Sequence, residues 1–288
     1  MARPYDCGLN RYSMLPPSSP LTPAPRVNWW QALLLGIVQG ATEFVPVSSS
    51  AHLNIAHRLL GQKTRQLPFD VVLSVGTIGA LGWYYRHDWK AMLREKEQRR
   101  LLFLVGLACV PAVLVAALSP IRKWEDSSKF LFSPFYNGLW MMLGGALLLG
   151  ADRYGSQTRD VADLKPSDAL WIGASQALAL VPGFSRSGST IATGLLLGLR
   201  REEAARFSFL LSLPISIGAV LYELRSFKPH SLGAGTGESA LGVASSGVSG
   251  FTAISLLLRA LHKRDVTPFV AWRALVGLFA VVWFWKER

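Results

Sequence analysis

Charged residues and cysteines are both scarce in this chain of 288 residues. Only 17% of the residues are charged, against roughly a quarter in soluble domains, while half are hydrophobic and ten are tryptophan. The two cysteines, Cys7 and Cys109, lie far apart, with no second cysteine or histidine at metal-ligand spacing. This excludes a disulfide framework and a zinc site as organising features. The composition is typical of an integral membrane protein.

Acidic residues are also few, 18 against 30 lysines and arginines, which gives a net charge of +12. Such a charge could indicate nucleic acid, but the basic residues gather in short segments between apolar runs, at 86–100, 199–206 and 261–265. Short basic segments beside membrane spans are typical of the cytoplasmic face of a membrane protein. We therefore expect no nucleic-acid partner and a surrounding of membrane lipid.

Six apolar runs approach the roughly 20 residues that a membrane-spanning helix needs. They cover residues 69–85, 101–118, 132–150, 207–222, 240–258 and 266–285. The sequence thus predicts an all-α polytopic membrane protein with six transmembrane helices. Residues 1–28 are rich in proline and serine and lack an apolar core, so we expect a disordered extension followed by a single integral-membrane domain at 29–288.

Two further apolar stretches do not resemble simple spans. Residues 29–45 carry Gln39 and Glu43 and end at Pro46, while residues 169–181 are short and end at Pro182. A serine-rich turn and a second short helical pattern follow each of them. This pattern predicts two re-entrant helical hairpins, whose irregular backbone is tolerated in a membrane only when it is buried in protein or lines a wet cavity.

The two hairpins align with each other. Placing Gly36 on Gly173 puts Gln39 on Gln176 and Ser49 on Arg186, and "IGALGWYYR" (78–86) later resembles "IGAVLYELR" (217–225). The repeat halves are then about 29–151 and 168–286. Each half has one hairpin and three spans, and because three is odd, the second half is inverted relative to the first. The two hairpins are expected to meet near the membrane midplane.

The second hairpin has the chemistry of an anion site. A buried arginine is costly in a membrane, and its planar fork suits a phosphate group. Glycines allow close backbone approach, hydroxyls donate hydrogen bonds, and the helix that we expect to begin near Ser189 would direct free N–H groups at the anion. The predicted phosphate cradle comprises Gly183, Ser185, Arg186, Ser187, Gly188, Ser189 and Thr190.

The first hairpin has complementary groups. Gln39 and Glu43 are four residues apart on one helix face, and both offer oxygens of the kind that a hard divalent cation binds. His52 follows within one turn of the serines and is a candidate for proton transfer or attack. The predicted residues of this half-site are Gln39, Glu43, Ser48, Ser49, Ser50 and His52.

The segments "GIVQGATEFVPVSSSAHL" (36–53) and "PGFSRSGSTI" (182–191) resemble the bacterial undecaprenyl-diphosphate phosphatases, also called bacitracin-resistance proteins. The resemblance implies hydrolysis of undecaprenyl diphosphate to undecaprenyl phosphate and inorganic phosphate, which recycles the lipid carrier of cell-wall synthesis. It also implies a requirement for Mg²⁺ or Ca²⁺, a location in the bacterial cytoplasmic membrane and an outward-facing active site. Gln39 stands where some members have a second glutamate, so a less charge-compensated metal site is expected.

Carried over by position, the resemblance implies that Glu43 and Gln39 serve the metal and diphosphate, that Ser49 and His52 serve the chemistry, and that Arg186 with its neighbours grips phosphate. Either Ser49 or His52 attacks phosphorus, or His52 activates water. A lipid-phosphate transporter using the same site is the alternative function. A homodimer is possible, since the glycine-rich span 141–150 would allow close helix packing.

Overall fold

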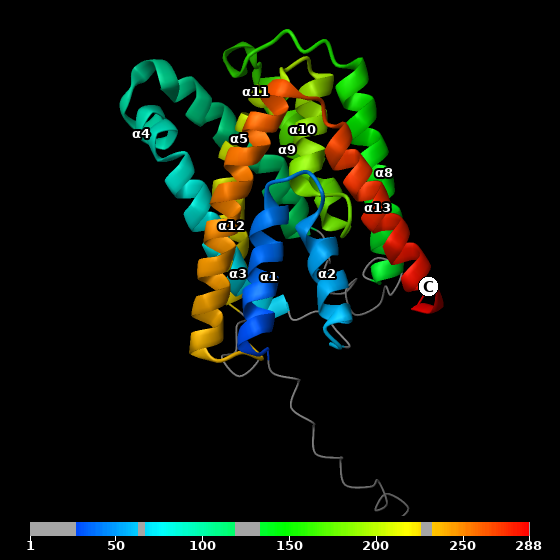
Figure 1. Cartoon of the computed structure of the whole chain (residues 1–288). Helices are drawn as coiled ribbons and strands as arrows, with labels where there is room; N and C mark the ends of the chain where they lie inside the picture. Colours follow the sequence, from blue (N-terminus) through cyan, green and yellow to red (C-terminus); the bar gives the residue numbers. More distant parts are fainter. Residues whose placement is uncertain (1–26, 63–66, 119–132, 226–231, 288) are drawn as a thin grey trace, which may run out of the picture.

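The computed structural model describes residues 27–62, 67–118, 133–225 and 232–287. In these ranges the secondary structure is helical, and no β-strand is formed (Figure 1). The first half contains α1 (Trp29–Glu43), α2 (Ser49–Leu59), α3 (Leu67–Tyr84), α4 (Arg86–Arg94), α5 (Arg99–Leu118) and α8 (Pro134–Tyr154). The second half contains α9 (Pro166–Ser175), the 3₁₀ turn η3 (Gln176–Leu180), α10 (Arg186–Leu196), α11 (Arg201–Leu224), α12 (Thr236–Lys263) and α13 (Thr267–Trp283).

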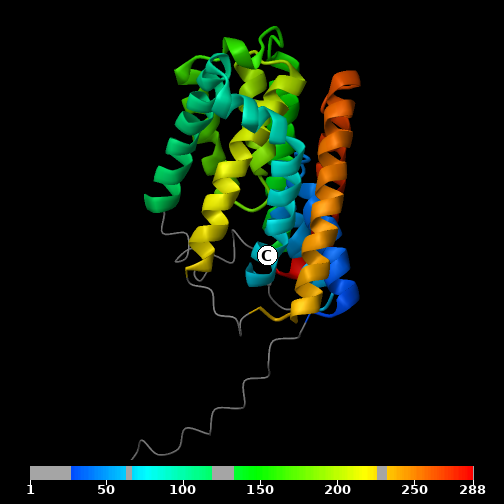
Figure 2. The ribbon, with the colours of Figure 1, turned by 90° about the vertical axis from the view of Figure 1, so that its left-hand side faces the viewer.

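Four segments of the described chain are long and apolar enough to cross a membrane: Leu67–Tyr84, Lys96–Val115, Arg201–Leu224 and Thr236–Lys263. They coincide with four of the six predicted spans. The other two predicted spans fall on α8 and on α13, which is apolar but has only 17 residues. The chain is therefore a multi-pass helical membrane protein, and its long helices run side by side in both views (Figures 1 and 2).

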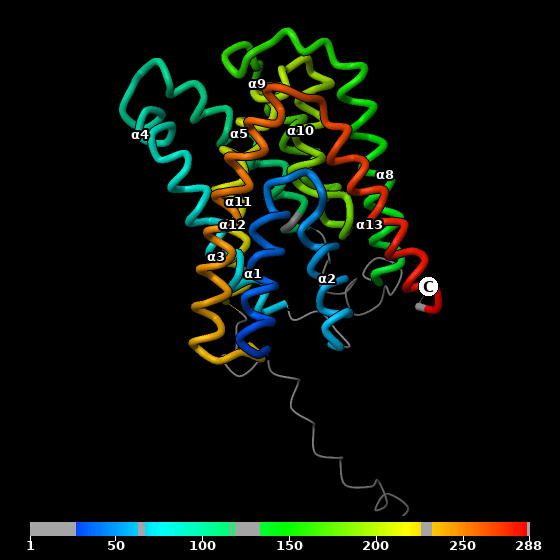
Figure 3. Tube along the Cα trace, in the orientation of Figure 1, coloured from blue at the N-terminus to red at the C-terminus, as the bar shows by residue number. Residues whose placement is uncertain are grey.

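Small residues bring α1 into close contact with the first half of α12, and the two lie side by side there (Figure 3). A Cβ atom built on Gly40 would lie 2.6 Å from the backbone nitrogen of Gly250 and closer still to the carbonyl of Ser246. The hydroxyl of Ser249 donates to the carbonyl of Ile37 at 3.2 Å. Membrane helices gain little from apolar burial against each other, so close backbone packing and hydroxyl bonds of this kind hold them together.

The two hairpins have matching backbone geometry. Helices α2 and α10 each have 11 residues and begin at Ser49 and Arg186, 137 positions apart as in the sequence alignment. Their N-cap residues, Ser48 and Ser185, have φ angles of 75° and 73°. Positive φ is uncommon for residues other than glycine. The same unusual turn is therefore built twice, once in each half.

Three expectations need correction. The helix after Pro182 begins at Arg186 rather than near Ser189, because Ser185 accepts a hydrogen bond from the Gly188 N–H and caps it. The basic segment 86–100, a short connection between spans by its sequence, instead begins with a helix: its first nine residues form α4, in which Met92 is buried. The predicted extension ends too late: Val27 is buried and Asn28 caps α1. Residues 1–26 lie outside the described part of the chain.

We expect Gly40→Ala to lower the free energy of unfolding by about 1–3 kcal/mol, since overpacking a close contact costs that much. The added methyl group would meet backbone atoms of α12 that cannot move away independently. Thermal unfolding of the detergent-purified protein measures the effect. Gly79→Ala is the matched control, because a Cβ atom there meets nothing within 4 Å. Equal unfolding midpoints for the two variants would contradict the packing argument.

Candidate active site

The turns of the two hairpins meet at an ion pair. Arg186, the first residue of α10, donates from Nη2 to Oε1 of Glu43, the last residue of α1, at 2.6 Å. Its Nη1 donates to the hydroxyl of Ser216 in α11 at 2.8 Å. The side chains of Arg186 and Glu43 are 19% and 17% exposed. The sequence repeat predicted this meeting of residues 143 positions apart, and the structure confirms it.

The second oxygen of Glu43 is equally engaged. The hydroxyl of Ser49 donates to Oε2 at 2.6 Å, and the side-chain amide of Gln39 donates to the same atom at 3.1 Å. Gln39 also approaches the hydroxyl of Ser74 at 3.4 Å. Hydrogen bonds to an ionised carboxylate are shorter and stronger than neutral ones. Glu43 thus orients a serine hydroxyl on one side and a guanidinium on the other.

Serine hydroxyls are paired in the same way in both turns. The Oγ atoms of Ser48 and Ser50 lie 3.2 Å apart, and those of Ser185 and Ser187 lie 3.1 Å apart. Ser187 also donates to the carbonyl of Val45 in the first hairpin, at 3.3 Å. Backbone strain of the kind seen at the two N-cap serines costs about 1–3 kcal/mol and is concentrated at functional sites. One serine pair thus lies in each hairpin, next in sequence to Ser49 in the first and to Arg186 in the second.

The remaining four residues of the predicted phosphate cradle, like Ser185, Arg186 and Ser187, also contact other parts of the protein. Ser189 donates to the carbonyl of Ser185 at 2.9 Å, and the hydroxyl of Thr190 lies 2.6 Å from that of Ser208. Gly183 has a φ of 116°, and a Cβ atom there would lie 2.6 Å from the carbonyl of Asn137. Gly188 leaves room for a neighbouring arginine of α13. In this structure these four residues shape the turn, while Arg186 reaches the first hairpin.

His52 does not join the Glu43–Arg186 pair. Its Nδ1 lies 2.8 Å from the carbonyl oxygen of Ser48, and its Nε2 lies 2.9 Å from the indole nitrogen of Trp272 in α13. Ser49, three residues earlier on the same helix, donates to Glu43 instead. The structure therefore places Ser49 against a carboxylate and His52 against an indole.

Arg273 is a functional residue whose role the sequence reasoning missed. It is fully buried and donates to four carbonyls. Their oxygens belong to Pro46 in the first hairpin (2.9 Å), Gly183 and Phe184 in the second hairpin (2.9 and 3.0 Å) and Met141 in α8 (2.8 Å). The sequence did contain a signal: Arg273 is the one arginine in the apolar run 266–285. A buried arginine is costly in a membrane, and this argument, used above for Arg186, applies equally to Arg273.

Glycines make space for the Arg273 side chain. A Cβ atom on Gly144 would clash with its guanidinium, and one on Gly188 would lie 2.9 Å from Nη1. Asn137 of α8 supports the second turn in a similar manner, by donating to the carbonyl of Pro182 at 3.2 Å. The last long helix of each half thus hydrogen-bonds to the hairpin of the other half.

The side chains of this site are suited to a cation that also binds the phosphates of a substrate. They are less suited to a cation bound by protein groups alone. Across the described residues no group of three or more His, Cys, Asp or Glu side chains forms a metal cage. Glu43 supplies one carboxylate, with the hydroxyl of Ser49 and the amide of Gln39 beside it. Mg²⁺ is commonly bound through one or two carboxylates together with substrate phosphates and waters. The residues therefore fit that type of site.

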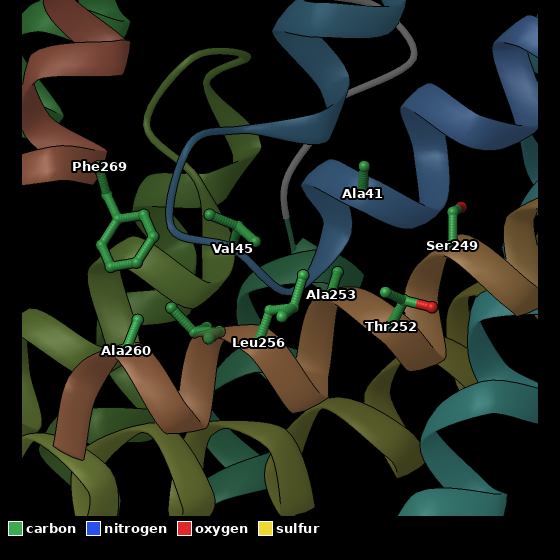
Figure 4. A pocket seen from close by; sticks show the side chains of 9 residues that line it. Ala41, Val45, Ser249, Thr252, Ala253, Leu256, Ala260 and Phe269 are labelled. Atoms are coloured by element: carbon green, nitrogen blue, oxygen red, sulfur yellow. The ribbon is translucent and has the colours of Figure 1, made fainter. Parts of the chain in front are cut away.

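An apolar groove of about 420 Å³ lies beside the first turn, between α1, α12 and the start of α13 (Figure 4). Ala41 and Val45 line one wall. Glu43 is two residues from Ala41, and successive helical residues turn by about 100°, so its side chain leaves α1 on a different face. The groove is lined by Ala41, Val45, Ser249, Thr252, Ala253, Leu256, Leu257, Ala260 and Phe269.

Comparison with known proteins gives consistent matches over the described fold. A sequence model of the family described as "Bacitracin resistance protein BacA" matches residues 32–279. An undecaprenyl-diphosphatase of Alcanivorax borkumensis is 39% identical, over 89% of this chain and 99% of that protein. One from Pelobacter propionicus is 43% identical, over 87% of this chain and 95% of its own. Another, from Desulforudis audaxviator, is 40% identical, over 89% and 98%.

We expect Arg273→Met to destabilise the protein by about 3–5 kcal/mol. It leaves several buried carbonyls unpaired, and each such group costs about 1–3 kcal/mol, part of which relaxation recovers. Thermal unfolding in detergent is the measurement. Arg259→Met is the matched control, since Arg259 is exposed on α12. Unchanged stability in Arg273→Met would show that the hairpin turns do not depend on this side chain.

Proposed function

Because the chain belongs to the bacitracin resistance protein BacA family, we propose that it hydrolyses undecaprenyl diphosphate to undecaprenyl phosphate and inorganic phosphate. This reaction regenerates the lipid carrier of cell-wall synthesis and confers resistance to bacitracin. The observation that carries the proposal is the arrangement of a serine hydroxyl, a carboxylate and a guanidinium at the contact of two hairpin turns. These groups are what transfer of a phosphoryl group from a lipid diphosphate requires.

Arg186 is the group that grips the terminal phosphate. Its guanidinium has five N–H donors, and its contacts to Glu43 and Ser216 leave others free to meet a phosphate. The N-terminus of α10 lies at the same place, and helix N-termini favour anions. The hydroxyls of Ser48, Ser50, Ser185 and Ser187 supply further donors. Charge on the transferred group is thereby met by groups already in position.

Ser49 is the nucleophile that the geometry favours. Its proton points at Glu43, so in the first step the proton passes to the carboxylate while Ser49 Oγ bonds to the terminal phosphorus. The bond from that phosphorus to the bridging oxygen breaks, and undecaprenyl phosphate leaves with the electron pair. Water then cleaves the phosphoserine and releases inorganic phosphate. Attack by His52 is less favoured because both of its ring nitrogens are occupied.

A divalent cation, Mg²⁺ or Ca²⁺, completes this proposal. Glu43 would hold it together with the diphosphate, with Gln39 beside them. Its contribution when bound is to neutralise negative charge on the phosphate oxygens. Gln39 is uncharged. The positive charges of Arg186 and of the cation would therefore together neutralise the negative charges of Glu43 and the diphosphate.

We also propose the finer membrane arrangement. Helices α3, α5, α8, α11, α12 and α13 cross the membrane, and the hairpins α1–α2 and α9–α10 enter from opposite faces as an inverted repeat. The matching bounds and cap angles of α2 and α10 support this. The membrane is the bacterial cytoplasmic membrane, with the active site facing outward. Because Gly144 and Gly145 pack against Arg273 within the chain, a homodimer would use another face.

We expect purified protein in detergent to release phosphate from a long-chain polyprenyl diphosphate. Ser49→Ala and Glu43→Gln should each lower kcat by about 10³-fold, and the double variant should fall little further, because groups that act as a unit are strongly non-additive. Ser255→Ala, in α12, is the control and should retain activity. Detergent removes the two sides of a membrane, so phosphate release there separates hydrolysis from transport. Near-normal turnover by Ser49→Ala would exclude Ser49 as nucleophile.

We expect chelation of divalent cations to abolish phosphate release, and added Mg²⁺ or Ca²⁺ to restore it. Titration calorimetry with Mg²⁺ in the presence of a non-hydrolysable diphosphate analogue gives a readout independent of turnover. Glu43→Gln should weaken that binding at least tenfold, because the single carboxylate of the site is lost. Full activity in chelator would contradict the cation role given to Glu43.

A further inference from the structure

The hydrogen bonds of His52 define its protonation state. The Ser48 carbonyl can only accept, so Nδ1, 2.8 Å away, carries a proton. The Trp272 indole nitrogen can only donate, so Nε2, 2.9 Å away, carries a lone pair. The two ring planes are nearly parallel, at 6°, with centroids 6.2 Å apart, which is compatible with an indole N–H directed at that lone pair. His52 is therefore a neutral imidazole whose sole proton-accepting position is covered.

The indole N–H of Trp272 is well placed to be displaced from His52 Nε2 by another hydrogen-bond donor. It is 48% exposed, whereas the adjacent Arg273 is fully buried among carbonyls of both hairpins. Arg273 therefore fixes this part of α13 against the turns, while the indole beside it has space on its outer side. The other group that faces the His52 ring, the Ser48 carbonyl, belongs to the strained N-cap of α2. A water molecule or a hydroxyl that donates to Nε2 must take the place of the indole N–H.

We propose that Trp272 is a positioning residue for His52: its indole N–H holds the ring with Nε2 as proton acceptor and gives way there to the water that attacks the phosphoserine. This inference rests on the proposed function, in which water attacks the phosphoserine after Ser49 has been phosphorylated. The O–H bond of the water breaks, its proton passes to Nε2, and its oxygen bonds to phosphorus. The bond from phosphorus to Ser49 Oγ then breaks, and Oγ takes back the proton that Glu43 received in the first step. Trp272 touches none of the reacting atoms and acts through the orientation of His52.

Trp272→Phe tests the proposal because it keeps an aromatic ring and removes the N–H donor. Diethyl pyrocarbonate acylates the unprotonated imidazole nitrogen, and mass spectrometry measures this at the His52 peptide, with the exposed His87 as an internal reference. We expect acylation of His52 to be at least fivefold faster in the variant. We also expect kcat for phosphate release to fall about fivefold with KM changed less than twofold, as loss of one orienting hydrogen bond implies.

Trp283→Phe is the matched control, since Trp283 lies on the same helix, is exposed and stacks on Phe279. It should match the unmodified protein in both measurements. If Trp272→Phe leaves either the acylation rate of His52 or kcat unchanged, Trp272 only packs and the proposal is wrong. If the unmodified protein releases no phosphate from any polyprenyl diphosphate, the proposed function fails, while the acylation experiment still reports whether the indole covers Nε2.

Discussion

Backbone carbonyls at the two hairpin turns cannot form helical hydrogen bonds, and the need to pair them with donors from other elements is the main constraint on this protein. Two chain reversals interrupt helices at Pro46 and Pro182, and the peptide groups there cannot bond within a helix. In a membrane each unsatisfied group costs several kcal/mol, so the turns exist only if other elements supply donors. Arg273 supplies most of them, reaching both turns at once, and Asn137 serves the carbonyl of Pro182. The hairpins, and thereby the active site, depend on these bonds.

The two arginines at the hairpin turns, Arg186 and Arg273, have different roles. Arg273 donates to four neutral backbone carbonyls, so its positive charge is met by their dipoles. Arg186 is partly exposed and faces the carboxylate of Glu43. A carboxylate that already holds a cation is easily shared with a second positive group or with a phosphate. One guanidinium therefore fixes the backbone while the other remains available for chemistry.

Much of this arrangement was predictable from the sequence. The internal repeat placed the first hairpin, with Glu43 at its turn, beside the second hairpin, with Arg186 at its turn, and the two residues are in contact. The i, i+4 spacing of Gln39 and Glu43 gave a contact that the structure contains. Roles were harder to predict than positions. The glycines and Thr190 resembled ligand-binding groups, but what they touch depends on neighbours from α8, α11 and α13 that no local pattern reveals.

The contacts of His52 could also not be predicted from its neighbours in the sequence. Its neighbourhood with Ser49 and Glu43 in the sequence suggested a cluster, yet helix geometry turns Ser49 toward the carboxylate and His52 toward α13. The partner that decides its protonation, Trp272, is 220 residues away. Neither the segment around His52 nor the segment around Trp272 contains a sequence pattern that would predict this contact.

The exchange of partners between the two halves has a consequence for biosynthesis. The carbonyl of Pro46 is bonded by a side chain 227 residues later in the chain, in α13. The second turn is served by both Asn137 and that same late arginine. The turn of the first hairpin therefore stays incompletely bonded until α13 has been synthesised and packed. A chain truncated before α13 could insert most of its helices and still lack a working site, so that phosphatase activity reports that α13 is in place.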